Sequence, residues 1–362
     1  MNSKSGTRRD FFSTASAAAA AAMLPLSTPG APQTAAAPQN SRAASQPIGC
    51  FASVVFGKFR LGEDAMLDAV QAAGFQGIEL FGPGRGARPP AAAPGAAPAP
   101  GTPPARAGAT PESIAAFKEK LAARGLTTTV GSLSLGRRGV PLADAIAAAR
   151  QSVTDAHALG QKFLLTLGTE DENQFIQFCK VLSDAAAFGQ ELGIQLVVKP
   201  HFGLNNTAGE LLGWVKQVNH PNFRLFWDPG NIIYYTGKDP VKQLEIVAPY
   251  VTGLVGKDCS VSMNQERMAG DPSFGQKDGS GNQVKIQFGT GKVDFVATFR
   301  KLKSVGFKGP IYIEGTLAGD TLEATIANAR ANREYLIRVM NQERWRPYFF
   351  GSAAARPAET AG

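Results

Sequence analysis

Short, unbroken apolar runs alternate with longer helical patterns from residue 48 to residue 340. Continuous hydrophobicity over so few positions is typical of parallel strands that are buried on both faces. The expected strands are Gly49–Phe56, Gly77–Phe81, Thr127–Leu133, Phe163–Leu167, Ile194–Lys199, Phe223–Asp228, Val251–Gly256 and Pro310–Glu314. The expected helices are Asp64–Ala73, Pro111–Arg124, Leu142–Leu159, Glu172–Leu192, Ala208–Val218, Asp294–Val305 and Thr321–Met340.

Eight strands that alternate with helices over about 300 residues predict an α/β fold, the (β/α)8 or TIM barrel, as a single domain. A doubly wound sheet is the alternative, but no Gly-rich phosphate-binding turn opens the first helix. We assign the barrel to residues 46–345 and a C-terminal tail to residues 346–362.

Residues 1–45 have the features of an export signal. The stretch Thr7–Phe12 contains two adjacent arginines, and the apolar run Ala17–Leu26 follows it. Small residues around Ala31 or Ala35–Ala37 suit a cleavage site. The apolar run is too short and too rich in alanine to predict a stable membrane span. We therefore expect a twin-arginine signal peptide and a periplasmic or other extracytoplasmic location.

The positive charge of the chain is concentrated outside the expected barrel elements. The formal net charge is +8, of which residues 1–45 carry +3 and residues 82–109 another +3. The segment 82–109 is almost entirely Ala, Pro, Gly and Arg, a composition that predicts a disordered insertion. The remaining +2 is too small for the basic surface that nucleic-acid binding requires, so nucleic acid is not an expected partner.

Polar residues fall at the expected carboxyl ends of the strands, where TIM barrels carry their chemistry. They are Glu79 on strand two, Lys199 and His201 at strand five, Asp228 and Asn231 at strand six, Lys257 and Asp258 at strand seven, and Glu314 on strand eight. Buried charges are costly unless they are paired or bound to a metal, so we expect several of these side chains to meet.

Motifs at these positions resemble those of a known family. Gly77–Leu80 (GIEL) resembles its strand-two G-x-E motif, Trp227–Asn231 (WDPGN) resembles its strand-six motif, and Gly289–Gly315 resembles its last βα unit. On these residues the chain resembles the sugar phosphate isomerase/epimerase family, the xylose isomerase-like TIM barrels, over residues 48–341. The resemblance implies a small carbohydrate as substrate. A DNA-repair endonuclease shares this barrel, but its histidine-rich metal cluster is not matched by a chain with three histidines.

The resemblance also implies a divalent cation held by Glu, Asp, His and Glu on strands five to eight. The chain keeps Asp228 and Glu314, but Lys199 takes the place of the first Glu, and Val255 takes the place of the His. An ammonium group at position 199 can neutralise the two carboxylates in place of a cation. We therefore expect either no cofactor or a weakly held Mn²⁺ or Mg²⁺ ion, with Asp228 and Glu314 as its ligands.

Three functions are compatible with this set. We favour a sugar isomerase or epimerase that abstracts a proton next to a carbonyl, or a closely related lyase, working without metal. The alternatives are a metal-dependent epimerase or lyase with a reduced ligand set, and a periplasmic sugar-binding protein without catalytic activity.

The favoured hypothesis assigns roles to residues at the strand ends. The catalytic residues are Glu314 as base, Lys199 as electrophile and His201 as donor to a substrate oxygen. The substrate-binding residues are Glu79, Asn231, Lys257 and Asp258. The sequence does not distinguish a monomer from a homodimer.

Overall fold

Eight parallel strands form the centre of the protein. The structure is a computed structural model, and it describes residues 47–79, 110–133, 135, 139–262 and 286–344. The strands are β1 Gly49–Phe51, β2 Gly77–Glu79, β3 Val130–Ser132, β4 Phe163–Thr166, β5 Gln195–Val198, β6 Phe223–Trp227, β7 Val251–Gly256 and β8 Ile311–Ile313. Their order in the sheet is β2-β1-β8-β7-β6-β5-β4-β3. A parallel bridge between Gly77 and Thr127 joins the two ends of this order, so the strands make a nearly closed barrel.

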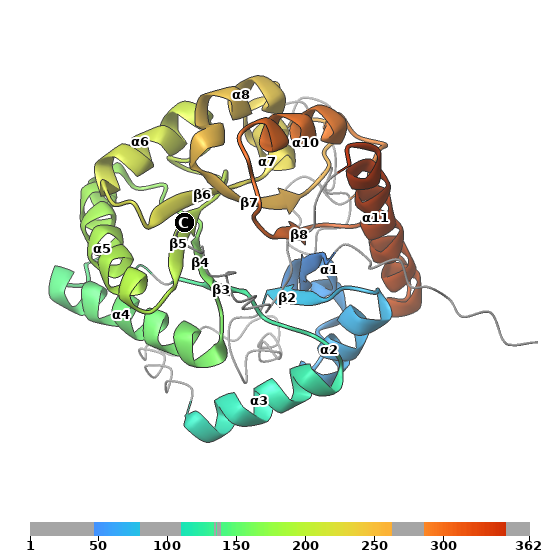
Figure 1. Ribbon diagram of the computed structural model, residues 1–362, viewed down its shortest axis with the longest axis horizontal. Helices are drawn as coiled ribbons and strands as arrows, with labels where there is room; N and C mark the ends of the chain where they lie inside the picture. Colours follow the sequence, from blue (N-terminus) through green and yellow to red (C-terminus); the bar gives the residue numbers. More distant parts are fainter. Residues whose placement is uncertain (1–46, 80–109, 134, 136–138, 263–285, 345–362) are drawn as a thin grey trace, which may run out of the picture. The chain divides into compact units, whose positions relative to one another are not determined.

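Helices alternate with the strands along the chain. They are α1 Ala52–Val55, α2 Glu63–Ala72, α3 Pro111–Ala123, α4 Leu142–Leu159, α5 Glu172–Glu191, α6 Ala208–Val218, α7 Pro229–Thr236, α8 Pro240–Val247, α10 Phe295–Ser304 and α11 Leu322–Gln342, with short 3-10 helices η1 Gly57–Phe59 and η2 Ala248–Tyr250. The longer helices, such as α3, α4, α5 and α11, lie outside the ring of strands (Figure 1). The predicted (β/α)8 barrel is confirmed, and each predicted helix is found with ends that differ by at most two residues.

Three predicted segments lie outside the described residues: the export signal 1–45, the insertion 82–109 and the tail 346–362. All described residues belong to one unit, Ala44–Gly362. Within them, none of the helices combines the length and the apolar character that crossing a membrane would require.

The first strand is shorter than predicted, because residues 52–55 are helical rather than extended. Ala52 and Val55 are buried while Ser53 between them is exposed, and this three-residue spacing suits a helix better than a strand.

The sequence analysis missed helices α7 and α8, which lie between β6 and β7. Each begins with the same local signal, an aspartate at the N-cap followed by a proline at the first helical position. The side chain of Asp228 accepts the backbone N–H of Asn231, and that of Asp239 accepts the backbone N–H of Val241.

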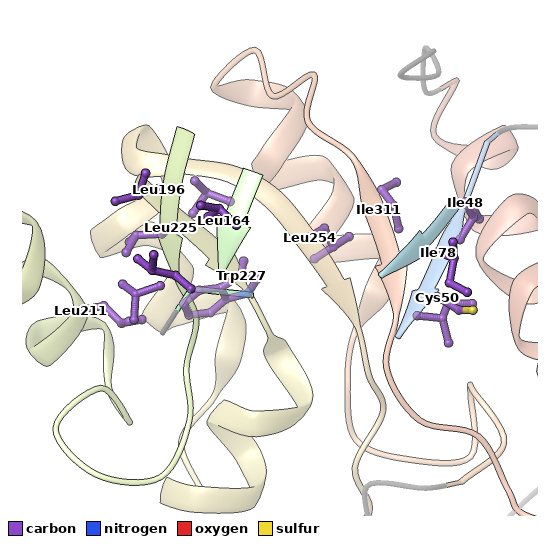
Figure 2. Packing of buried hydrophobic residues seen from close by; sticks show 14 of the residues in the cluster. Ile48, Cys50, Ile78, Leu164, Leu196, Leu211, Leu225, Trp227, Leu254 and Ile311 are labelled. Atoms are coloured by element: carbon purple, nitrogen blue, oxygen red, sulfur yellow. The ribbon is translucent and has the colours of Figure 1, made fainter. Parts of the chain in front are cut away.

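Two apolar layers hold the barrel together. The outer layer lies between strands and helices, and Figure 2 shows part of it, including Leu196, Leu225 and Leu254 on three neighbouring strands. The inner layer fills the barrel itself and consists of Phe51, Val130, Leu165, Val197, Phe226, Val255 and Tyr312. Because side chains alternate across a strand, consecutive strand residues contribute to one layer and then to the other.

The same alternation positions the polar residues at the barrel mouth. Val197, Phe226, Val255 and Tyr312 face the barrel interior from β5, β6, β7 and β8. The residues two positions further on face the same side, and they are Lys199, Asp228, Lys257 and Glu314. A layer of four charged groups therefore lies directly beyond the inner apolar layer, at the carboxyl ends of four consecutive strands.

Candidate active site

Two lysines and two carboxylates form a buried group that we call the charge cluster: Lys199, Asp228, Lys257 and Glu314. Their exposed fractions are 1%, 0%, 5% and 7%, respectively. They come from the ends of β5 to β8, which are consecutive neighbours in the sheet. The prediction that several strand-end charges meet is therefore correct for these four residues.

Lys199 contacts both carboxylates. Its ammonium nitrogen Nζ donates to Oδ2 of Asp228 at 3.1 Å and also donates to Oε2 of Glu314. The same nitrogen lies 5.4 Å from the centre of the Phe51 ring, a distance at which the ring face attracts a cation. The amine therefore points into the barrel mouth and not into solvent.

Lys257 contacts the same two carboxylates from β7. Its Nζ donates to Oε1 of Glu314 at 2.7 Å and lies 3.6 Å from Oδ2 of Asp228. It also donates to the side-chain oxygen of Asn231 at 2.9 Å. Each lysine thus bridges both acids, and both oxygens of Glu314 accept a hydrogen bond from an ammonium group.

Asp228 is held in place by the helix that it starts. Its Oδ1 accepts the backbone N–H of Asn231 at 2.9 Å, which leaves Oδ2 for the lysines. The side-chain amide of Asn231 then donates to the carbonyl of Pro200 at 2.8 Å and ties α7 to the end of β5. The DPGN stretch therefore serves as a helix start and as a support for the charge cluster.

The charges inside the cluster set its protonation. Burial alone would raise the pKa of Glu314, but Lys199 and Lys257 outweigh burial and hold that pKa well below its ordinary value. Burial alone would lower the pKa of Lys257, but Asp228 and Glu314 outweigh it and raise that pKa. The carboxylate of Glu314 is therefore ionised, and it becomes an effective base only when other acceptors take the ammonium hydrogens away from it.

These residues do not fit a divalent cation. Both oxygens of Glu314 and one oxygen of Asp228 accept hydrogen bonds from ammonium groups, so a cation at these oxygens would meet two positive charges. Val255, where the resemblance implies a histidine ligand, belongs to the apolar inner layer. Across the ranges that the structure describes, no three His, Cys, Asp or Glu residues are grouped so that they could hold a metal ion.

Three rings that follow β5 or lie on α7 form what we call the aromatic rim: His201, Phe202 and Tyr235. The ring centres of His201 and Tyr235 are 5.5 Å apart, and those of Phe202 and Tyr235 are 6.0 Å apart. Burial, and then the charges of Lys199 and Lys257, lower the pKa of His201 to about 4, so its imidazole is neutral at neutral pH.

Tyr235 is a residue that the sequence analysis did not select. Burial raises the pKa of its phenol to about 12, and the charges of Lys257, Asp228 and Glu314 also act on it. Tyr235 lies four residues after Asn231 on α7, and residues at this spacing share one face of a helix. Recognising the α7 helix in the sequence would have identified Tyr235 as a neighbour of Asn231.

Asn205 is a second residue that was missed. It is fully buried, and its side-chain amide donates to the backbone carbonyl of Lys199 at 2.6 Å and to that of Leu167 at 3.0 Å. It thereby joins the ends of β4 and β5 and orients the backbone that carries Lys199. We find no local sequence pattern that predicts this contact.

The predicted substrate contact Glu79 lies on β2, opposite Phe51 of β1. It is 2% exposed, and its charge contributes, after burial, to raising the pKa of Cys50. In the sheet β1 lies between β2, which carries Glu79, and β8, which Glu314 follows. The strands of these two acids are therefore not direct neighbours.

Asp258 has the contacts of a loop anchor. Its carboxylate accepts the backbone N–H groups of Cys259 at 2.8 Å, Gly289 at 2.9 Å, Gly291 at 3.0 Å and Val293 at 3.2 Å. A Cβ at Gly291 would lie 2.1 Å from this carboxylate, so the close approach requires glycine. Contact of Asp258 with a substrate stays a prediction, because its known hydrogen bonds all go to the backbone.

Comparison with known proteins identifies a family. The profile of the xylose isomerase-like TIM barrel matches residues 67–338. No curated protein matches the chain.

Solved structures with the same fold cover most of the chain at low identity. A xylose isomerase domain protein from Planctomyces limnophilus has 22% identity and a TM-score of 0.56, and covers 82% of this chain and 98% of its own. A D-allulose 3-epimerase from Methylomonas sp. has 17% identity and a TM-score of 0.52, with coverage of 82% and 98%. A probable 3-DHS dehydratase from Bacillus anthracis has 13% identity and a TM-score of 0.55, with coverage of 80% and 98%.

Proposed function

The chain belongs to the family of xylose isomerase-like TIM barrels, and from this premise we propose that it is an isomerase or epimerase of a small sugar. The reaction would move a proton on a carbon next to a carbonyl group, without a metal ion. The observation that supports this proposal is the convergence of two ammonium groups on the buried carboxylate of Glu314. The proposed base would then lie within reach of two hydrogen-bond donors.

The proposed chemistry assigns a role to each member of the charge cluster. The ammonium groups of Lys199 and Lys257 donate to the carbonyl oxygen and the neighbouring hydroxyl of the sugar. As they turn toward the substrate, the carboxylate of Glu314 is freed and accepts the proton from carbon. The electron pair of the broken C–H bond forms a carbon–carbon double bond, and the π pair of the carbonyl moves to its oxygen, where the ammonium groups stabilise the resulting enediolate.

Return of the proton decides the product. Delivery to the former carbonyl carbon, while the hydroxyl proton of the neighbouring oxygen passes to the former carbonyl oxygen, gives isomerisation. Delivery to the opposite face of the same carbon by the ammonium group of Lys199, which Glu314 then reprotonates, gives epimerisation. Loss of a leaving group from the next carbon would instead give a lyase, which is a close variant of the same chemistry. In this scheme His201 donates from its neutral imidazole, while Glu79 and Asn231 contact sugar hydroxyls.

One observation favours a second candidate, a sugar-binding protein without turnover. Both oxygens of Glu314 accept hydrogen bonds from ammonium groups, and its pKa is lowered. A sugar that cannot separate these ion pairs would be bound and released unchanged.

Hydrogen exchange separates the two candidates. The protein would be incubated in D₂O with D-allulose, D-tagatose or D-fructose, the sugars that are named with solved structures of the same fold. NMR would then follow the incorporation of deuterium at the carbons next to the carbonyl. We expect exchange with the wild type and a loss of about 100-fold or more in Lys199→Met. The matched control is Lys120→Met, a change at the surface pair with Glu63 and Asp64. Binding without exchange in the wild type would support the sugar-binding protein instead.

We also propose an extracytoplasmic location, on the basis of the Arg8–Arg9 pair and the apolar run after it. Cell fractionation of the full chain should place it in the periplasm. Replacement of both arginines by lysine should retain it in the cytoplasm, and equal export of the two forms would contradict the proposal.

A further inference from the structure

We propose that the site selects an uncharged sugar, one without a phosphate or carboxylate group, and binds its C–H face against Tyr235. This inference rests on the proposed function, because it names the substrate class of the same site. Two separate observations support it: the charge balance of the charge cluster and the composition of the aromatic rim.

The charges of the cluster cancel. Lys199 and Lys257 each contribute one positive charge, and Asp228 and Glu314 each contribute one negative charge. The imidazole of His201 is neutral at neutral pH, and Glu79 can only add negative charge. Among the residues that the structure describes, this cluster therefore offers hydrogen-bond donors but no surplus positive charge for an anion.

Geometry gives the same result. An anionic group that approaches either ammonium of the cluster also approaches Glu314, because the two lysines bond to its two oxygens. The repulsion from Glu314 and Asp228 then cancels the attraction to the lysines. A hydroxyl or carbonyl oxygen carries no full charge, so it can share the ammonium hydrogens without this repulsion.

The aromatic rim fits the other side of such a ligand. Phe202 is 43% exposed, and its ring lies beside Tyr235, which in turn lies beside His201. Helix α7 carries both Asn231, which bonds to Lys257, and Tyr235 one turn later on the same face. A sugar whose oxygens reach Lys257 would therefore present its C–H face to the Tyr235 ring.

The test compares ligands that differ only in charge. Calorimetry on the full chain would measure binding of D-fructose, D-fructose 6-phosphate and inorganic phosphate. We expect the wild type to bind the free sugar about 10-fold or more tightly than its phosphate ester, and not to bind inorganic phosphate. Tighter binding of the ester, or binding of inorganic phosphate, would overturn the proposal.

A charge variant gives a second result that needs no sugar. Glu314→Gln leaves the cluster with one surplus positive charge, so this variant should acquire binding of inorganic phosphate. The matched control is Glu119→Gln, which removes one negative charge from an exposed position on α3. Failure of Glu314→Gln to bind phosphate while it remains folded would overturn the charge-balance argument, whether or not the wild type exchanges protons.

The contribution of the ring is tested at Tyr235. Tyr235→Ala should weaken D-fructose binding about 10-fold, while Tyr235→Phe should keep it. An equal loss of affinity in both variants would show that the Tyr235 hydroxyl, and not its ring, contacts the sugar, which would overturn the stacking proposal. Unchanged affinity in Tyr235→Ala would overturn it as well. Tyr250→Phe, at the amino end of β7, is the control for a distant tyrosine.

Discussion

The ammonium nitrogen of Lys199 lies 3.1 Å from Oδ2 of Asp228, although the two residues are 29 positions apart in the sequence. Adjacent parallel strands bring them together, since Val198 of β5 pairs with Leu225 of β6. Both side chains are almost completely buried. A charge pair in such a place is stable only as a pair, so each member depends on the other.

Removal of the Lys199 charge should destabilise the fold. Lys199→Met leaves Asp228 and Glu314 with one ammonium group in place of two, and we expect the free energy of unfolding to fall by about 3 kcal/mol. Denaturant titration measures this change. Lys120→Met, at a partly exposed ion pair, should cost less than about 1 kcal/mol. Equal stability of Lys199→Met and the wild type would show that the cluster does not depend on this charge.

A change at the same position should create a metal site. In Lys199→Glu three carboxylates would converge, and we expect this variant to bind Mn²⁺, whereas the wild type should not. Paramagnetic resonance of Mn²⁺ measures the bound fraction directly. The control is Lys120→Glu, which makes the same charge change at the surface. Mn²⁺ binding by the wild type at the level of Lys199→Glu would contradict our interpretation of the charge cluster.

Glu314 should make stability depend on acid pH. Its pKa in the folded protein is lowered from the ordinary value of 4.5, so the folded state resists protonation more than the unfolded chain does. Its contribution is complete above about pH 4.5 and is lost as the pH falls further. In Glu314→Gln the slope of unfolding free energy against pH should therefore be shallower by up to about 1.4 kcal/mol per pH unit. Identical slopes would mean that the pKa is not lowered.

His201 should titrate far below neutral pH. Burial is the main cause of its lowered pKa of about 4, so the imidazole should stay neutral from pH 8 down to about 5. NMR can follow this, because the chain has only three histidines and His201→Gln identifies the signal. The neutral form is favoured by folding, so this contribution to stability is lost as the pH falls from 6.5 towards 4. A midpoint near 6.5 would contradict the lowered pKa that partial burial and the two lysines cause.

Asp258 should act on the loop rather than on the ligand. Asp258→Asn replaces one acceptor oxygen by a donor amide that faces backbone N–H groups, and we expect a loss of about 3 kcal/mol in unfolding free energy. Amide hydrogen exchange should become faster at Gly289, Gly291 and Val293. Unchanged exchange together with weaker sugar binding would favour the substrate contact that the sequence analysis expected.

The barrel could be predicted from the sequence because its signals are local. Continuous apolar runs such as residues 196–198 become buried strands, and the alternation along each run decides which residues face inward. Caps are local as well, since Asp228 and Asp239 each bond to backbone within three residues. The same short-range pattern predicted Lys199, Asp228, Lys257 and Glu314 at the strand ends.

Only the tertiary structure decided the hydrogen-bond and ion-pair partners of each polar residue. Lys199 and Glu314 are 115 positions apart, and their contact depends on the order and register of four strands. The same is true of Asp258, whose carboxylate is occupied by backbone N–H groups more than 30 positions away. Tyr235 likewise meets His201, 34 positions earlier, only because α7 and the end of β5 lie close together in the fold. Local patterns determine which elements form and which way side chains point, whereas electrostatic partners depend on where distant strands stop.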